Sequence, residues 1–142
     1  MTKKQYLKQG LKLKRELDHD NDMLRELKKS LDMIQAVRLK ERVQGGPLKD
    51  DSGIVEKMNK IVELENKIRS EILKIEDFRI ELSKKINGVK DSDEKILLES
   101  RYFLFMPWEK IADKLCYSLS HTYKLHGRAL ENFEFCENDS KW

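Results

Sequence analysis

The sequence predicts an all-α protein: a long N-terminal antiparallel helical hairpin that forms a coiled coil, followed by a C-terminal helix-turn-helix. The 142 residues are 39% charged and include only six Gly and two Pro, a composition typical of long helices. Leu and Ile recur at steps of three and four residues through two long segments. After these segments, residues that typically start a helix recur at short intervals along the chain. We expect a hairpin and oligomerisation region over residues 1–90, a helix-turn-helix over 91–136 and a tail over 137–142.

The first long segment carries a heptad repeat with charged residues on its other faces, as a solvated helix requires. A Gly- and Pro-containing stretch at residues 44–53 ends this helix. Within that stretch, Asp51 or Ser52 can cap the next helix. The seam positions are Tyr6, Gly10, Leu13, Leu17, Asp20, Leu24, Leu27, Leu31 and Ile34.

The second long segment runs from about Ile54 to Ile86 and keeps the repeat, interrupted at Glu65 and Arg79. Each helix would be roughly 50 Å long at about 1.5 Å per residue. Equal lengths joined by one short loop predict an antiparallel hairpin. The polar seam residues, Asp20 among them, either set the register or lie at a solvent-exposed edge. The apolar seam positions are Ile54, Met58, Ile61, Ile68, Ile72, Ile75, Leu82 and Ile86.

A two-helix hairpin buries little apolar surface, so we expect it to pair with a second copy or with the C-terminal helices. A homo-oligomer, most simply a dimer, is the first expectation. The expected oligomerisation residues are Leu13, Leu17, Leu24, Leu27, Leu31, Ile34, Ile61, Ile68, Ile72 and Ile75.

Three shorter helices are predicted after a turn at residues 87–88. Residues 91–93 carry Asp, Ser and Asp, which cap a helix predicted over 93–104. The next helix is predicted over 106–115, with Pro107 at its first helical position, where a missing amide hydrogen costs nothing.

The last helix is predicted from Leu119 to about Phe135, after a turn at residues 116–117 and an N-cap at Ser118. This order of elements is a helix-turn-helix with an extra helix in front. Its apolar or small inward-facing residues are Ile111, Ala112, Leu115, Thr122, Leu125, Ala129 and Phe133.

The outward face of these helices carries candidate DNA contacts. Hydroxyl, imidazole and amine groups on the first turns of the last helix can reach base edges in a major groove. Lys110, Lys114 and Arg128 suit phosphates, which position a protein without reading sequence. The alternative is a helical packing module of the same pattern that does not touch DNA. The candidate DNA-binding residues are Ser118, Ser120, His121, Tyr123, Lys124, Arg128, Lys110 and Lys114.

A resemblance to known families rests on Arg101-Tyr102, Trp108–Ala112, Tyr117-Ser118, Thr122-Tyr123 and His126–Leu130. Residues 94–130 resemble region 4 of bacterial sigma factors, and more closely the RinA- and ArpU-like phage late-transcription regulators with that region. The whole length is loosely similar, because a helical N-terminal half with a short Gly-rich break suits the phage proteins. The families usually carry Gly where Cys116 stands and an aliphatic β-branched residue where Thr122 stands.

The resemblance implies a sequence-specific regulator in the bacterial host cytoplasm. It would bind promoter or operator double-stranded DNA, activate phage late genes and act through host RNA polymerase. Two other functions stay open: a small terminase-like DNA-packaging subunit, and a polymerase-binding adaptor without DNA binding of its own.

Charge is unevenly distributed along the chain. Residues 1–91 hold 22 basic and 17 acidic residues, a net charge of +5, whereas residues 92–142 hold 7 and 9, a net charge of −2. A helix-turn-helix with that charge should bind DNA weakly by itself. The first fifteen residues carry six basic residues and no acid, and either lie along phosphates or form a solvated helix start.

The sequence predicts no enzyme, no cofactor and no metal site. Cys116 and Cys136 lack metal-ligand spacing, and His19, His121 and His126 form no ligand cluster with them, which favours a reducing cytoplasm. No phosphate-binding Gly loop, metalloprotease helix or nucleophile elbow occurs. No apolar run approaches the ~20 residues of a membrane span, so no membrane partner is expected.

Overall fold

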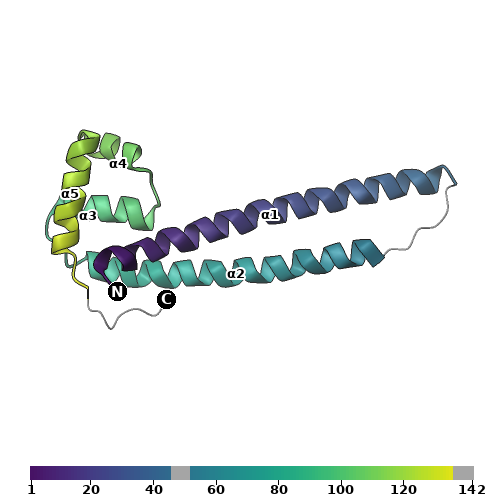
Figure 1. Cartoon of the computed structure of the whole chain (residues 1–142), viewed down its shortest axis with the longest axis horizontal. Helices are drawn as coiled ribbons and strands as arrows, with labels where there is room; N and C mark the ends of the chain where they lie inside the picture. The colour runs from purple at the N-terminus through teal and green to yellow at the C-terminus, as the bar shows by residue number, and fades with distance from the viewer. Residues whose placement is uncertain (46–51, 136–142) are drawn as a thin grey trace. The chain divides into compact units, whose positions relative to one another are not determined.

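The computed structural model describes residues 1–45 and 52–135, and within these ranges it is all-helical, without a strand (Figure 1). Among the short elements, η1 is a π-helical turn that directly follows α3. The elements in chain order are α1 (Lys3–Val43), α2 (Ser52–Ile86), α3 (Ser92–Leu98), η1 (Glu99–Phe103), α4 (Trp108–Leu115) and α5 (Leu119–Asn132).

The long helices begin and end close to the predicted places. α1 ends just before Gly45, whose φ of 74° lies in the left-handed region that glycine adopts without strain. α2 begins at Ser52, two residues earlier than predicted. Ser52 therefore lies inside the helix rather than at its cap, and Asp51, the other predicted cap, lies outside the described residues.

The short helices differ from the prediction in three details. The helix predicted over 93–104 is α3 and the π-turn η1, in which the amide of Leu104 donates to the carbonyl of Glu99 at 2.9 Å. Pro107 is the N-cap of α4 with extended backbone, not its first helical residue. α5 ends at Asn132 because Phe133 turns to extended backbone and packs into the core, so the prediction of a helix to Phe135 was wrong by three residues.

Two compact units make up the described chain. The core unit consists of residues 1–15 and the residues from 73 onward, and so combines the start of α1, the end of α2 and all the short helices. The paired-helix unit consists of residues 16–72.

In the paired-helix unit, α1 and α2 lie side by side with opposite chain directions (Figure 1). Lys67 pairs with Asp20 at 3.1 Å, and Lys28 pairs with Glu65 at 3.2 Å. Apolar burial is incomplete: Ile61 and Ile68 are buried, whereas Ile72 is exposed. The predicted seam residues that are only half-buried are Leu17, Leu24, Leu27, Leu31, Ile34 and Ile54.

The core unit holds the main hydrophobic cluster. The ring of Tyr6 lies 5.5 Å from that of Phe78 and 6.3 Å from that of Phe133, centroid to centroid. Lys3 donates through Nζ to the carbonyls of Leu130 and Glu131, which the end of α5 leaves without helical partners. The first turns of α1 are therefore packed into the fold. The buried apolar residues of the cluster are Tyr6, Leu7, Phe78, Leu82, Ile86, Val89, Leu97, Leu98, Tyr102, Ile111, Leu125, Ala129 and Phe133.

None of the helices in residues 1–45 and 52–135 combines the length and the hydropathy that a membrane-spanning helix needs.

Candidate functional site

The turn between α4 and α5 follows from two residues. Cys116 ends α4 in the left-handed conformation, with φ 60° and ψ 37°, and its amide donates back to the carbonyls of Ala112 and Asp113. Glycine usually occupies this position, because it adopts the left-handed conformation without strain. Cys116 forms the same turn with some backbone strain. Ser118 is the N-cap of α5, and its Oγ accepts from the amide of His121 at 3.1 Å.

The inward faces of α4 and α5 are those the sequence predicts. Ile111 and Ala112 of α4 are buried, as are Thr122, Leu125 and Ala129 of α5, whereas Leu115 is half-buried. The hydroxyl of Thr122 donates to the carbonyl of Ser118 at 2.9 Å. This bond satisfies the polar atom, which lets a threonine occupy a position that an aliphatic residue otherwise takes.

All eight candidate DNA-binding side chains lie on exposed residues of α4, α5 and the turn between them. Ser120 and Lys124 make no side-chain hydrogen bond within residues 1–45 and 52–135. Lys114 differs, because its Nζ donates to Oγ of buried Ser100 at 3.2 Å. A phosphate contact from Lys114 would have to replace or share that bond.

Aromatic contacts fix the start of α4 against α5. The ring of Trp108 lies edge-on to Tyr123 at 5.3 Å and to His126 at 4.7 Å between centroids. Tyr123, which the sequence assigns to the outward face, is therefore held by an aromatic neighbour although it stays 48% exposed. An aromatic side chain held in this way loses little further freedom when it meets a ligand.

His126 is a packing residue. Its Nε2 lies 2.7 Å from the hydroxyl of Tyr102. Burial lowers the pKa of His126 to about 4, and the positive charges of Lys4 and Arg101 act in the same direction. His126 is therefore neutral at neutral pH, and burial likewise raises the pKa of Tyr102 to about 12.

His121 packs against the turn. Its ring lies 4.4 Å from that of Tyr117, edge-on, and the hydroxyl of Tyr117 donates to the carboxylate of Asp93 in α3. This hydrogen bond raises the pKa of Tyr117, and burial adds to the shift. The first turn of α5 is thus connected to α3 through Tyr117.

The charge around the candidate site differs from the charge of its sequence segment. Residues 92–142 carry a net charge of −2, but the core unit also includes residues 1–15, with a net charge of +6, and residues 73–91, with +1. The core unit therefore carries +5 and the paired-helix unit −2. The objection that this segment is too acidic to bind DNA does not hold for the folded unit.

The sequence analysis did not include Arg101 among the candidate site residues, although this half-buried side chain lies next to Trp108. Its guanidinium lies 4.7 Å from the centre of the Trp108 ring, and its Nη1 donates to the carbonyl of Met106 at 3.0 Å. Arg101 also lines a hollow of about 520 Å³ with basic residues of α1. Its neighbours in the sequence gave no signal of this hollow, because the residues of α1 that share it are far away in the chain.

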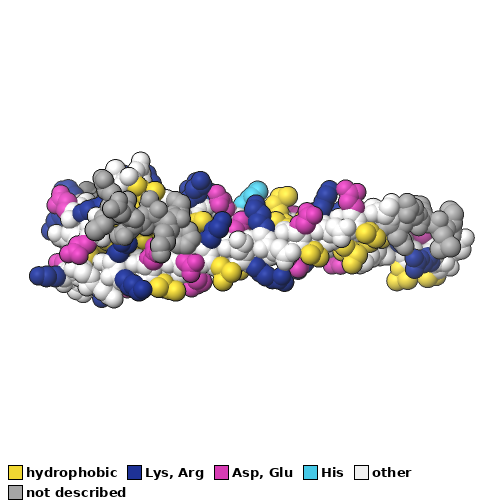
Figure 2. Space-filling view, turned by 90° about the horizontal axis from the view of Figure 1, so that it is seen from below, with side chains coloured by type: hydrophobic (Ala, Val, Ile, Leu, Met, Phe, Trp, Pro, Cys, Tyr) yellow, Lys and Arg dark blue, Asp and Glu magenta, His cyan; other side chains and the backbone are white. Residues whose placement is uncertain are grey.

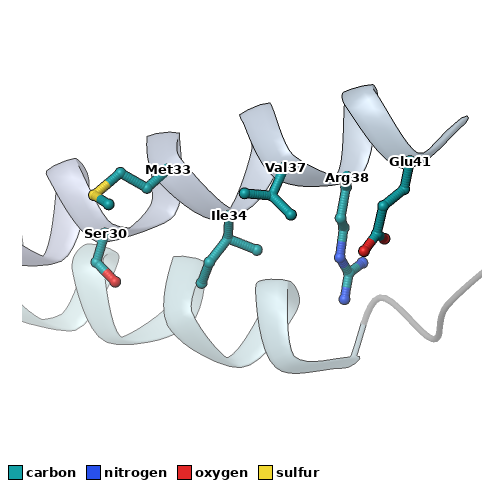
Figure 3. Close-up of a pocket in the computed structure, with 6 residues that line it drawn as sticks. All are labelled: Ser30, Met33, Ile34, Val37, Arg38 and Glu41. Carbon is teal, nitrogen blue, oxygen red and sulfur yellow. The ribbon is translucent and has the colours of Figure 1, made fainter. Parts of the chain in front are cut away.

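A second hollow, of about 450 Å³, lies on the paired-helix unit along α1. Figure 3 shows Ile34 pointing toward α2, with Arg38 about one turn and Glu41 about two turns further along α1. Met33 and Val37 contribute its apolar lining, and both are largely exposed, at 62% and 57%.

No group of His, Cys, Asp or Glu side chains within the two described ranges could hold a metal ion. Cys116 is an exposed free thiol, and Cys136 and the predicted tail lie outside the described residues.

Residues 33–134 match one protein family, described as "Protein of unknown function (DUF1492)". The match covers the end of α1, α2 and all the short helices. No curated protein and no solved structure matches the chain.

Proposed function

Since the chain belongs to the DUF1492 family, whose description assigns no function, we propose one from the geometry of its short helices: α4 and α5 form a helix-turn-helix that binds double-stranded DNA sequence-specifically and regulates transcription. In this proposal α5 enters the major groove and its first two turns read base edges. The protein is not an enzyme in this proposal.

The observation that carries the proposal is the combination of a left-handed turn at Cys116 with an exposed polar face on α5. The turn and the Ser118 cap redirect the chain between the end of α4 and the start of α5. Thr122, Leu125 and Ala129 face inward. The same helix exposes its polar side chains on the opposite side, and those nearest its start are Ser120, His121, Tyr123 and Lys124.

The resemblance to sigma region 4 and to RinA- and ArpU-like regulators supports the biological setting. We propose promoter or operator DNA as the ligand, phage late genes as the target, and contact with host RNA polymerase in the bacterial cytoplasm. The families usually carry Gly at the position of Cys116 and an aliphatic β-branched residue at that of Thr122. Both residues of this chain are compatible with the turn, because Cys116 adopts the left-handed conformation and the hydroxyl of Thr122 has a hydrogen-bond partner.

Oligomerisation is the second part of the proposal, with the paired-helix unit as the oligomerisation region of a coiled-coil hairpin. Hydrophobic side chains remain at the surface of α1 and α2 between charged ones (Figure 2). Exposed apolar surface along both long helices suits a second copy of the chain, most simply in a dimer. Two DNA-binding modules in one dimer would also raise the effective concentration of each at its half-site. The exposed apolar residues of this unit are Met23, Met33, Val37, Leu39, Val43, Val55, Met58, Val62 and Ile72.

The test compares two lysines on the proposed DNA face. Lys124→Ala should weaken binding at the specific site by about 1–3 kcal/mol and relax base preference at one position, because Lys124 reads a base. Lys110→Ala should weaken binding to all sequences about equally and reduce the salt slope by about one unit, because Lys110 contacts a phosphate. Binding across a site library at two salt concentrations measures both effects.

Lys90→Ala is the control, since Lys90 is exposed and lies before α3, away from α4 and α5 in the chain. Equal effects of all three substitutions would contradict base reading by α5. A wild-type protein that binds polymerase but no DNA would favour the adaptor function, and a closed ring of many subunits on DNA would favour packaging.

A further inference from the structure

A basic hollow in the core unit is formed by the first turns of α1 and by Arg101 of η1. Its volume is about 520 Å³, and none of its described lining residues is acidic. The polar residues that line it are Gln5, Lys8, Gln9, Lys12, Arg15 and Arg101.

The helical spacing of α1 explains why its basic residues share one side of the hollow. Gln5, Lys8 and Lys12 follow at steps of three and four, which places them on one helix face, and Arg15 continues it. Tyr6 and Leu7 on another face are fully buried, and this anchors the helix. The basic face is therefore held in a fixed position against the core.

Arg101 is held on the other side of the hollow. Stacking on Trp108 and the bond to the Met106 carbonyl fix its guanidinium. Its Nε is buried and has no hydrogen-bond partner within the described chain. A guanidinium held in place in this way adds a fixed positive charge to the hollow, which favours an anionic ligand such as a phosphate.

The hollow is connected to the proposed DNA face by packed side chains. Arg101 lies over one side of Trp108, and Trp108 contacts Tyr123 on the exposed face of α5. The basic residues of α1 and the helix proposed to enter the groove therefore belong to the same compact unit and are connected through Arg101 and Trp108.

We propose that this hollow binds backbone phosphates of the DNA duplex next to the segment that α5 reads. The inference rests on the proposed DNA-binding function and adds a second, sequence-independent contact to it. Lys8, Lys12 and Arg15 supply the cations, and Arg101 supplies the fixed guanidinium. The contact provides the electrostatic affinity that the acidic segment 92–142 lacks.

The experiment measures DNA affinity of the full chain as a function of salt for a Lys8→Gln and Lys12→Gln double variant. Each lost phosphate contact should flatten the slope of log K against log salt by about 0.9, so the double variant should lose about 1.8 units. Specific and unrelated duplexes should weaken by the same factor, because phosphates carry no sequence information. Both lysines are exposed, so the fold should survive, which a thermal melt checks.

The matched control is Lys84→Gln with Lys90→Gln, which removes two exposed cations from the same unit without touching the hollow. In a second experiment, the duplex is shortened on one side or the other of the specific site, and the affinity is measured for each length. Wild-type affinity should fall as flanking phosphates are removed on one side, whereas the Lys8 and Lys12 variant should be insensitive to that truncation.

The outcomes separate this inference from the proposed function. If wild-type protein binds DNA but the hollow and control variants behave alike, the hollow does not bind phosphates, and DNA binding by α5 stands. If wild-type protein binds no duplex at any salt concentration, both proposals are overturned together.

Discussion

Gly10 shows how one residue controls packing in the core unit. A Cβ added at Gly10 would lie 2.3 Å from Cε1 of Phe78, and two more ring atoms would lie within 3 Å. The Phe78 ring is fully buried and cannot move aside freely. The missing side chain lets α1 approach α2 closely enough for the aromatic residue to fill the space between them.

Gly10→Ala should therefore destabilise the core unit by about 1–3 kcal/mol, because overpacking outweighs the gain in helix propensity. Chemical denaturation followed by circular dichroism measures the free energy of unfolding. Gly127→Ala is the control, since Gly127 lies in α5 with open space where its Cβ would stand, and it should stabilise by up to about 1 kcal/mol. A Gly10→Ala protein as stable as wild type would contradict the close contact with Phe78.

At the scale of elements, the helix pair of residues 16–72 contains a buried pair of carboxyl groups. Asp20 of α1 and Glu71 of α2 are both about 6% exposed, and Lys67 lies 3.1 Å from Asp20 and 3.8 Å from Glu71. Burial raises the pKa of Glu71 to about 7, and a hydrogen bond to Asp20 and the charge of Asp20 add to the shift. The same hydrogen bond lowers the pKa of Asp20, so the two groups share one proton.

The stability of the paired-helix unit should therefore fall as pH rises from about 4.5 to 7. In this window the folded state keeps the Glu71 proton, whereas the unfolded chain has already released it, so raising the pH favours unfolding. Glu71→Gln should remove this slope and make the protein more stable than wild type above pH 7. Hydrogen exchange of the α2 amides, measured at a series of pH values and corrected for intrinsic exchange rates, gives the local stability of the paired-helix unit.

Glu63→Gln provides a matched control, because Glu63 is an exposed carboxyl on the same helix and its substitution should leave the slope unchanged. A wild-type protein whose α2 protection does not change between pH 5 and 7.5 would show that Glu71 does not hold its proton there.

At the scale of the whole molecule, charge and apolar surface are divided between the two units. The core unit carries +5 and the proposed DNA contacts, whereas the paired-helix unit carries −2 and nine of the fifteen large apolar residues that are exposed in the described chain. An acidic surface is repelled by DNA, which suits a region that pairs with protein rather than with phosphates. The division supports separate roles for the two units in the proposed regulator.

Val37→Asp should weaken self-association at least tenfold, because it places a charge among the exposed apolar residues that the second copy is proposed to cover. Sedimentation or light scattering over a concentration series measures the dissociation constant. Asn21→Asp adds the same charge at an exposed polar position of α1 and should have little effect. A wild-type chain that stays monomeric at every accessible concentration would refute the oligomer.

Much of the local structure could be predicted from the sequence, because helix ends and faces depend on neighbouring residues. Asp91 caps α3 through a bond from the amide of Glu94, Ser118 caps α5, and Gly45 ends α1, all at the predicted places. The inward face of α4 and α5 followed from a repeat of 3.6 residues. The π-turn after Leu98 could not be predicted, since Glu99–Phe103 has the composition of an ordinary helix.

What the sequence determined by itself is an all-helical chain whose helices have known starts, ends and apolar faces, since those depend on steps of one to four residues. Only the tertiary structure decided which distant segments share a unit. It brought Lys8 and Lys12 to Arg101, Asp20 to Glu71, and the basic start of α1 to the acidic C-terminal segment. The physical reason is that charge, desolvation and close packing depend on distances in space, and heptad periodicity does not specify which residues of one helix meet which of another.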